Sequence, residues 1–179
     1  IEYPYQFTFT GNPLVRNHGA ADPDVHVWGD TVWMYCSQDH DGGYANMDGY
    51  HAFSSTDLIN WTDHGDVFNS TMLDENRWGK TPDHWMWAPG AARKKNEYGE
   101  WIYYLYYPHN VKFDGQNWVT GVATAPTPAG PFTDQGPLKN GKMGMDPMVF
   151  IDNNGEAYIY SNSLIVAKLN PDMVSLAEA

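Results

Sequence analysis

A hairpin pattern that occurs three times is the feature that most constrains this chain. In each copy a strand begins at an X-Pro dipeptide, reverses at a glycine followed by an acidic residue, and returns. The prolines are Pro23, Pro89 and Pro147, which are 66 and 58 residues apart. The chain therefore contains an internal repeat of roughly 60 residues, and this repeat decides the fold before any single residue does.

A weaker pair of strands follows each hairpin in the same phase. It lies at residues 52–65 and 123–136, and more loosely at 167–173. Four strands in a repeat of this length are typical of a β-propeller blade. We therefore predict an all-β fold, a partial β-propeller catalytic domain over residues 1–179 with blades starting near residues 22, 88 and 146. No segment predicts a long helix.

The number of repeats predicts an open array. A closed propeller needs about four to eight blades, so three blades leave two bare sheet faces. We expect either that the natural protein continues past Ala179 or that copies of the chain complete one another, and that the fragment self-associates. A short alternating run at residues 6–10 predicts one strand before the first blade. We expect this strand to form the edge of the last, missing blade.

Composition excludes several classes of partner. The formal net charge of −12 argues against nucleic acid, whose binding depends on Lys and Arg at phosphates. The chain has no apolar run of about 18 residues, so we expect no membrane partner and no signal peptide. Eight Trp and twelve Tyr suit a packed β core and a surface that stacks on sugars. Cys36 is the only cysteine, and its apolar neighbours predict a small buried side chain.

Residues 38–50 form a polar, glycine-rich stretch that reads as a long loop. It contains Asp39, Asp41 and Asp48, whose carboxylates could hold a calcium ion. The stretch lacks the ligand spacing and the terminal Glu of an EF-hand loop. We therefore predict a solvated loop and no metal site here.

The residues before the three prolines are the candidate site. In a propeller the first strand of each blade lines the central channel, so Asp22, Ala88 and Asp146 should converge at one mouth, with Trp87 beside them. Two carboxylates and an indole on one cavity are what a glycosidase requires. Asp-Pro is also a common way to start a strand, but the shared phase of both Asp residues favours function. Trp87 taken alone is more often a core residue.

The ordered set of motifs resembles family 43 of the glycoside hydrolases. The segments that carry the resemblance are residues 21–25, 54–61, 87–89, 129–132 and 145–150. The resemblance implies a five-bladed propeller and an inverting enzyme that acts on β-xylosides, α-L-arabinofuranosides or arabinans. It implies that Asp22 is the general base, that Asp146 tunes the pKa of the acid and orients it, and that Trp87 walls the sugar subsite.

The resemblance also implies that one catalytic group lies elsewhere. The family's general acid is a Glu that opens the next blade, which the repeat places near residue 205, about 60 residues after Pro147. Glu97, Glu100 and Glu156 lie at hairpin turns, so none is a good substitute. No cofactor is required, and the occasional structural calcium of such propellers takes its ligands from later blades.

These observations predict a secreted or periplasmic hydrolase of arabinoxylan-type glycans, with arabinofuranosidase or xylosidase activity. The main alternative is a non-catalytic carbohydrate-binding propeller that keeps Trp87 and its aromatic surroundings. A protein-interaction propeller would have no use for an acidic pair in the channel. A retaining fructosidase is disfavoured, because its Asn-Asp-Pro-Asn-Gly opening is absent around Asp22.

Overall fold

The strands form three antiparallel sheets, as the repeat predicts. The computed structural model describes residues 1–40, 47–78, 85–113, 116–162 and 164–177. The first sheet has the order β1-β5-β4-β3-β2, the second β6-β7-β8-β9 and the third β10-β11-β12. The bounds are β1 (Tyr5–Thr8), β2 (Ala21–Trp28), β3 (Thr31–Ser37), β4 (Gly49–Ser55), β5 (Asn60–Asn69), β6 (Gly90–Lys95), β7 (Trp101–Phe113), β8 (Gln116–Ala125), β9 (Thr133–Pro137), β10 (Met148–Ile151), β11 (Ala157–Tyr160) and β12 (Val166–Leu169).

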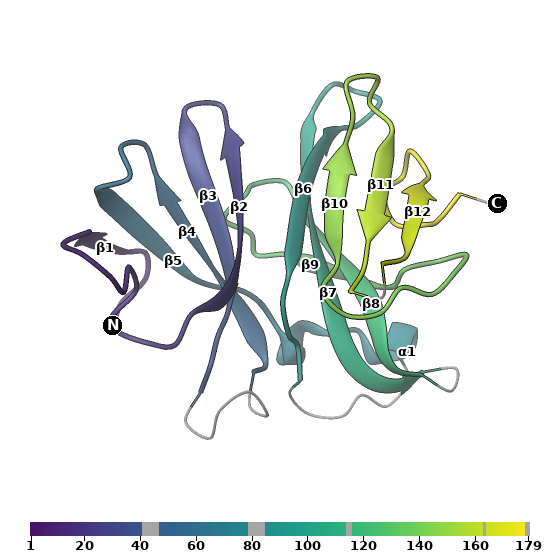
Figure 1. Cartoon of the computed structure of the whole chain (residues 1–179), viewed down its shortest axis with the longest axis horizontal. Coiled ribbons are helices and arrows are strands. Elements are labelled where there is room, and N and C mark those ends of the chain that lie inside the picture. The colour runs from purple at the N-terminus through teal and green to yellow at the C-terminus, as the bar shows by residue number, and fades with distance from the viewer. Residues whose placement is uncertain (41–46, 79–84, 114–115, 163, 178–179) are drawn as a thin grey trace.

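The three sheets fan out like blades, and each places its first repeat strand innermost (Figure 1). These inner strands are β2, β6 and β10, and β6 contacts both of the others. Helical structure among the described residues is limited to the short elements η2 (Ser70–Met72) and α1 (Glu75–Trp78). The all-β partial propeller predicted from the sequence is confirmed.

Each inner hairpin reverses at a glycine with positive φ. Gly29, Gly99 and Gly155 have φ values of 71°, 79° and 85°, a left-handed conformation that glycine adopts without steric cost. The strands on either side pair in register, as in Trp28 with Thr31. The glycine-acid dipeptides of the sequence therefore mark real hairpin turns.

The N-terminal strand is an edge strand of the first sheet and not of a missing blade, which corrects the expectation from sequence. β1 pairs with β5, with Phe7 opposite Trp61, and so adds a fifth strand to the first sheet. Its apolar side chains explain the position. Phe7, with Leu14 and Val15 from the following segment, packs on the buried cluster around Phe53 and Trp61. The N-terminal segment therefore covers part of the outer face of the first sheet.

Two larger cores hold the sheets together. One contains Tyr35 and Tyr107 and joins the first and second sheets, and the other contains Tyr106 and Ile159 and joins the second and third. Strands that pack against sheets on both sides are apolar on both faces, which explains the weak alternation in sequence. Cys36 is buried, as predicted, and burial raises the pKa of its thiol to about 12.

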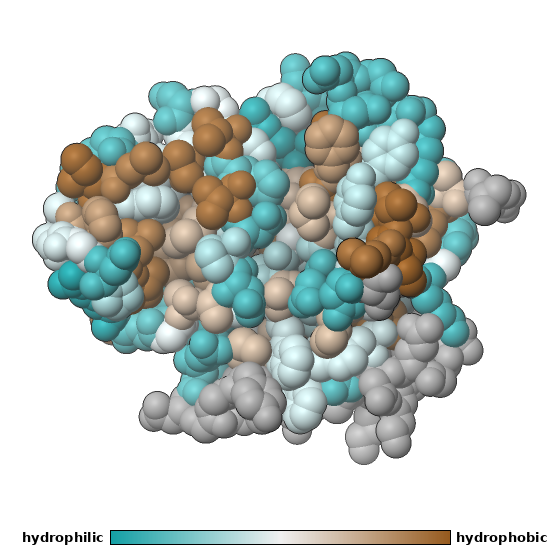
Figure 2. Space-filling view, viewed as in Figure 1, coloured by the Kyte–Doolittle hydropathy of each residue, from teal (hydrophilic) through white to brown (hydrophobic). Residues whose placement is uncertain are grey.

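The third sheet is shorter than the other two. Its last strand, β12, begins at Val166, and a single bridge between Leu169 and Leu176 lies beyond it. Exposed apolar side chains gather on the inner strands and on this sheet, and Figure 2 shows such patches on both sides of the visible face. None of the described helices is long and apolar enough to cross a membrane.

Candidate active site

Asp22 lies at a β-bulge in the innermost strand of the first sheet. The β2–β3 pairing passes from Ala21 opposite Ser37 to Asp24 opposite Tyr35, so β2 carries one extra residue there. Asp22 has a φ of 49°, a left-handed conformation that Asp tolerates better than most side chains. A bulge redirects a side chain from the regular alternation, and here it leaves the Asp22 carboxylate exposed.

Asp146 occupies the matching position before β10. It also has a left-handed φ, of 53°, and is also exposed. A left-handed conformation at a non-glycine residue is uncommon, and such strain gathers at functional sites when the surrounding structure maintains it. The two residues that share a phase in the sequence therefore also share a local conformation.

Contacts between inner strands bring the three strand starts together. The Asp24 carboxylate accepts a hydrogen bond of 2.5 Å from the Ala91 amide, which ties β2 to β6. On the other side, Gly90 lies so close to the Pro147 carbonyl that a Cβ at Gly90 would clash with it. Burial, and then the charge of Asp22, raise the pKa of Asp146.

Asp22 is held by residues of the same sheet. The Ser37 hydroxyl donates a hydrogen bond of 3.2 Å to the Asp22 carboxylate. Burial, and then the charge of Asp22, raise the pKa of the Tyr50 phenol well above its ordinary value. The Tyr50 hydroxyl donates to the Trp87 carbonyl at 2.7 Å, which links the site to the start of the second blade.

Trp87 belongs to a cluster of three half-buried indoles that sequence reasoning missed. Its ring centroid lies 6.1 Å from that of Trp85, nearly parallel at 9°, and 4.5 Å from that of Trp118. The alternation of Trp85 and Trp87 could have predicted part of this, since residues two apart in extended chain share a face. Trp118 lies in β8, far along the sequence, and only tertiary structure places it here.

A separate groove of 670 Å³ lies along the hairpin-turn ends of the inner strands. It is lined by Trp28, Arg93, Trp101 and Phe150 among others, and the Arg93 guanidinium stacks over Trp101 at 4.0 Å. Asp22, at the other end of β2, is not among its lining residues. The groove is therefore distinct from the predicted site.

The candidate metal loop is only partly described, since Asp41 lies outside the described residues. Asp48 has its carboxylate 2.7 Å from the His40 imidazole. One group among the described residues places three potential metal ligands together, and it consists of His18, His51 and Asp63. Calcium prefers oxygen ligands, and this group is mostly nitrogen, so it does not fit the structural calcium of the family.

The described glutamates at the hairpin turns serve local structure. Glu156 pairs with Lys168 and accepts a hydrogen bond of 3.0 Å from the Tyr158 hydroxyl. Glu100 accepts one of 3.0 Å from Asn96. Both lie at the turns and not at the strand starts, so neither stands where a general acid for Asp22 is expected.

The described residues thus form a partial propeller with an aspartate in the same left-handed conformation at two equivalent strand starts. The sequence profile of Glycosyl hydrolases family 43 matches residues 10–179, and the chain belongs to this family.

Curated relatives agree with this assignment. The chain is 32% identical to the arabinoxylan arabinofuranohydrolase of Bacillus subtilis (strain 168), covering 89% of this chain and 34% of the relative. It is 36% identical to xylosidase/arabinosidase 43A of Humicola insolens, covering 85% and 46%. The chain thus spans less than half the length of these two relatives.

Solved structures give the same fold. A family 43 β-xylosidase/α-arabinofuranosidase from a compost microbial metagenome, in complex with xylotriose, superposes with a TM-score of 0.78 at 27% identity. The match covers 97% of this chain and 62% of that one. An α-L-arabinofuranosidase from Clostridium thermocellum gives a TM-score of 0.66 at 34% identity, covering 89% and 54%.

Proposed function

We propose that the protein is an inverting glycoside hydrolase that acts on α-L-arabinofuranosides or β-xylosides of plant cell-wall glycans such as arabinoxylan. The observation that carries this proposal is the pair Asp22 and Asp146, which share a strand-start position, a left-handed backbone and an electrostatic coupling. The printed activities of the relatives, on arabinosides and xylosides, support the substrate class. A polymeric substrate of this kind favours a secreted or periplasmic location.

In this mechanism Asp22 is the general base. Its carboxylate is exposed and is oriented by the Ser37 hydroxyl, so it can accept a proton from a water molecule. The water oxygen then bonds to the anomeric carbon from the face opposite the leaving group. The glycosidic bond breaks, and the leaving oxygen takes a proton from an acid about 6.5–9.5 Å from the base. We propose that this acid is a Glu supplied by a further blade.

Asp146 and Trp87 have supporting roles in this proposal. Asp146 places a second carboxylate near Asp22, and its charge raises the pKa of a neighbouring acid and helps to orient it. The Trp87 indole, held against Trp85 and Trp118, forms a flat wall against which a sugar ring can pack. No cofactor takes part, and any structural calcium has its ligands outside these blades.

The first test replaces the base. Asp22→Asn in the full-length enzyme should lower turnover on aryl arabinofuranosides and xylosides by about 10²–10⁴, because water is no longer activated. Binding of xylo-oligosaccharides should persist, since the side-chain volume is unchanged. Asp30→Asn, at the exposed turn of the same hairpin, is the matched control and should keep wild-type turnover. Wild-type turnover in Asp22→Asn would refute the assignment of the base.

A non-catalytic carbohydrate-binding propeller is the second candidate, and the cluster of three indoles is the observation that favours it. A binding module needs the aromatic wall but not the carboxylate pair. The same assay separates the two functions. Xylo-oligosaccharide binding by the wild-type protein without turnover on any arabinoside or xyloside would favour the binding module.

A further inference from the structure

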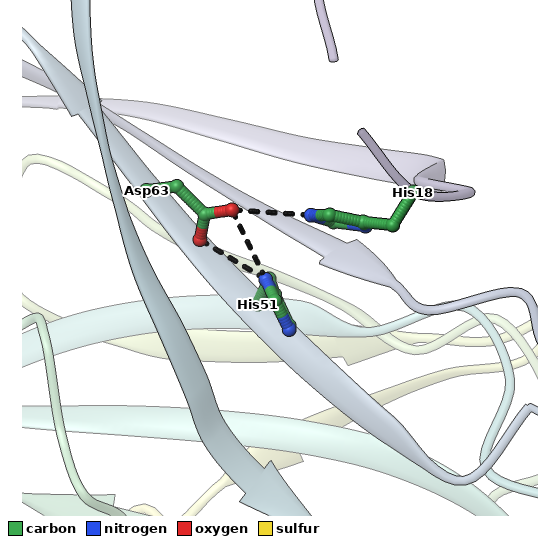
Figure 3. Close-up of side chains that lie close together, drawn as sticks. All are labelled: His18, His51 and Asp63. Carbon is green, nitrogen blue, oxygen red and sulfur yellow. Dashed lines mark hydrogen bonds and ion pairs between the residues drawn. The ribbon is translucent and has the colours of Figure 1, made fainter. Parts of the chain in front are cut away.

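The cluster of His18, His51 and Asp63 lies in the first blade, on the opposite side of the β4–β3–β2 ladder from the second sheet. His51 lies in β4 and Asp63 in the neighbouring strand β5, and His18, which precedes β2, joins them from farther away in the sequence (Figure 3). Their side chains are 14%, 3% and 0% exposed. Neither the family assignment nor the proposed mechanism uses these residues.

One carboxylate oxygen of Asp63 faces both rings. Its Oδ2 lies 3.1 Å from His18 Nε2 and 3.3 Å from His51 Nδ1. Ligands bound to zinc at about 2.0–2.1 Å in a tetrahedron are about 3.3 Å apart, so both separations already match two edges of such a site. The other oxygen, Oδ1, lies 3.0 Å from His51 Nδ1 and accepts a hydrogen bond of 2.9 Å from the Gly65 amide, which fixes the carboxylate.

The outer ring nitrogens also face oxygen. His18 Nδ1 lies 2.9 Å from the Gly19 carbonyl, and His51 Nε2 lies 3.0 Å from the Asp66 carboxylate. Metal-binding histidines usually donate their second N–H to a carbonyl or carboxylate in this way, which fixes the tautomer. All four ring nitrogens therefore face an oxygen that can only accept a hydrogen bond.

The two rings also lie close together, with centroids 4.4 Å apart in a largely buried site. A divalent cation between His18 Nε2, His51 Nδ1 and the Asp63 carboxylate would leave each outer ring nitrogen on its own oxygen partner and would offset the charge of the buried carboxylate.

The second blade has an aspartate at the position equivalent to Asp63, and none of its hydrogen bonds described below involves a histidine. Asp134 follows the same Asp-x-Gly pattern, and its Oδ1 accepts from the Gly136 amide at 2.8 Å. Its other partners are the Tyr107 hydroxyl at 2.6 Å, the Trp78 indole at 3.0 Å and the Asp74 amide at 2.8 Å. The two histidines at Asp63 are therefore not required by the turn itself.

We infer that His18, His51 and Asp63 form a structural binding site for a divalent transition-metal cation of the zinc type, which clips the N-terminal segment to the first blade. Two imidazoles and one carboxylate suit zinc better than calcium or magnesium. Water fills the fourth position, which is reachable because the His18 side chain is 14% exposed. The site is separate from Asp22 and Asp146 and does not depend on their proposed roles.

The test is a calorimetric titration of the demetallated full-length protein with zinc chloride. We expect one equivalent of zinc to bind, because the cluster offers one set of three ligands. His18→Gln should weaken binding at least tenfold. His26→Gln is the matched control, since His26 contacts a single carboxylate, Asp24, at 2.7 Å, and it should bind zinc like the wild type.

Two further measurements do not depend on enzymatic activity. Saturating zinc should raise the Tm of the wild type by about 5 °C and leave that of His18→Gln unchanged. Cobalt in place of zinc should give the visible absorption of a tetrahedral ion. No zinc binding, or equal binding by the wild type and a folded His18→Gln, would overturn the inference and leave the cluster as a hydrogen-bonded network.

Discussion

At the scale of the residue, the left-handed conformation of Asp22 and Asp146 distinguishes the site from ordinary strand starts. Asp adopts this region more readily than most residues, because its short polar side chain can hydrogen-bond locally. Both residues are exposed, although Asp22 lies on an innermost strand and Asp146 just before another. Residue type and backbone conformation therefore work together to keep two acids accessible at one end of the sheets.

The coupling of these two acids can be measured directly. The Asp146 pKa is raised by burial and by the charge of Asp22. Asp22→Asn removes that charge, so the Asp146 pKa should fall toward its ordinary value, as followed by carbon NMR of the side-chain carboxyl. Asp24→Asn is not a suitable control because it breaks the contact with Ala91, whereas Asp30→Asn should leave the Asp146 pKa unchanged. An unaltered Asp146 pKa in Asp22→Asn would show that the carboxylates do not interact.

The role of Trp87 can be separated from that of a core residue. Trp87→Ala should weaken xylo-oligosaccharide binding by about 1–3 kcal/mol, by analogy with the stacking of aromatic side chains on other flat ligands. Trp101→Ala, in the separate groove at the hairpin-turn ends, is the control and should retain affinity. Unchanged affinity with a lower Tm in Trp87→Ala would assign the residue to the core.

At the scale of the element, close approach of β6 and β10 sets the geometry of the strand starts. Gly90 begins β6, and the Pro147 carbonyl occupies the space where its Cβ would be. A backbone atom moves aside less easily than the end of a flexible side chain. The absence of a side chain at Gly90 is therefore what allows the second and third blades to meet at the site.

A larger residue at this position should separate the blades. Gly90→Ala forces the two backbones apart and should lower the free energy of unfolding of the full-length protein by about 1–3 kcal/mol, as measured by urea denaturation. Gly144→Ala is the matched control, because the nearest atom to its Cβ position is 3.9 Å away. An equal free energy of unfolding in the two variants would show that the close approach of β6 and β10 does not restrict the residue at position 90.

At the scale of the whole molecule, three blades leave apolar surface uncovered. Val27 on β2 is 69% exposed and Phe150 on β10 is 52% exposed. Burial of such surface is worth about 25 cal/mol per Å², so several hundred Å² is comparable with a typical total stability of about 5–15 kcal/mol. The N-terminal segment covers part of the outer face of the first sheet, but not these strands.

We therefore expect the isolated 179-residue chain to self-associate and to hydrolyse no glycoside by itself, since none of its described glutamates stands where the acid is expected. Light scattering measures the association, and Val27→Lys with Phe150→Lys should reduce it by placing charge on the exposed strands. A stable folded monomer of the unmodified chain would contradict the first expectation. Hydrolysis of an aryl arabinoside by this chain would contradict the second.

The sequence by itself determined the repeat and therefore the architecture. X-Pro strand starts and glycine-acid turns recur at a fixed spacing, and backbone sterics convert these local signals into hairpins at known places. The same phase selected Asp22 and Asp146, because equivalent positions of successive blades converge. These are local or periodic features, which a linear sequence carries directly.

Only the tertiary structure decided which distant residues meet. It placed β1 on β5 and not beside a further blade, because the apolar side chains of the N-terminal segment find their partners on the first sheet. It also brought Trp118 to Trp87, and His18 to His51 and Asp63. Such contacts depend on side-chain packing between segments far apart in the chain, and no periodic pattern records them.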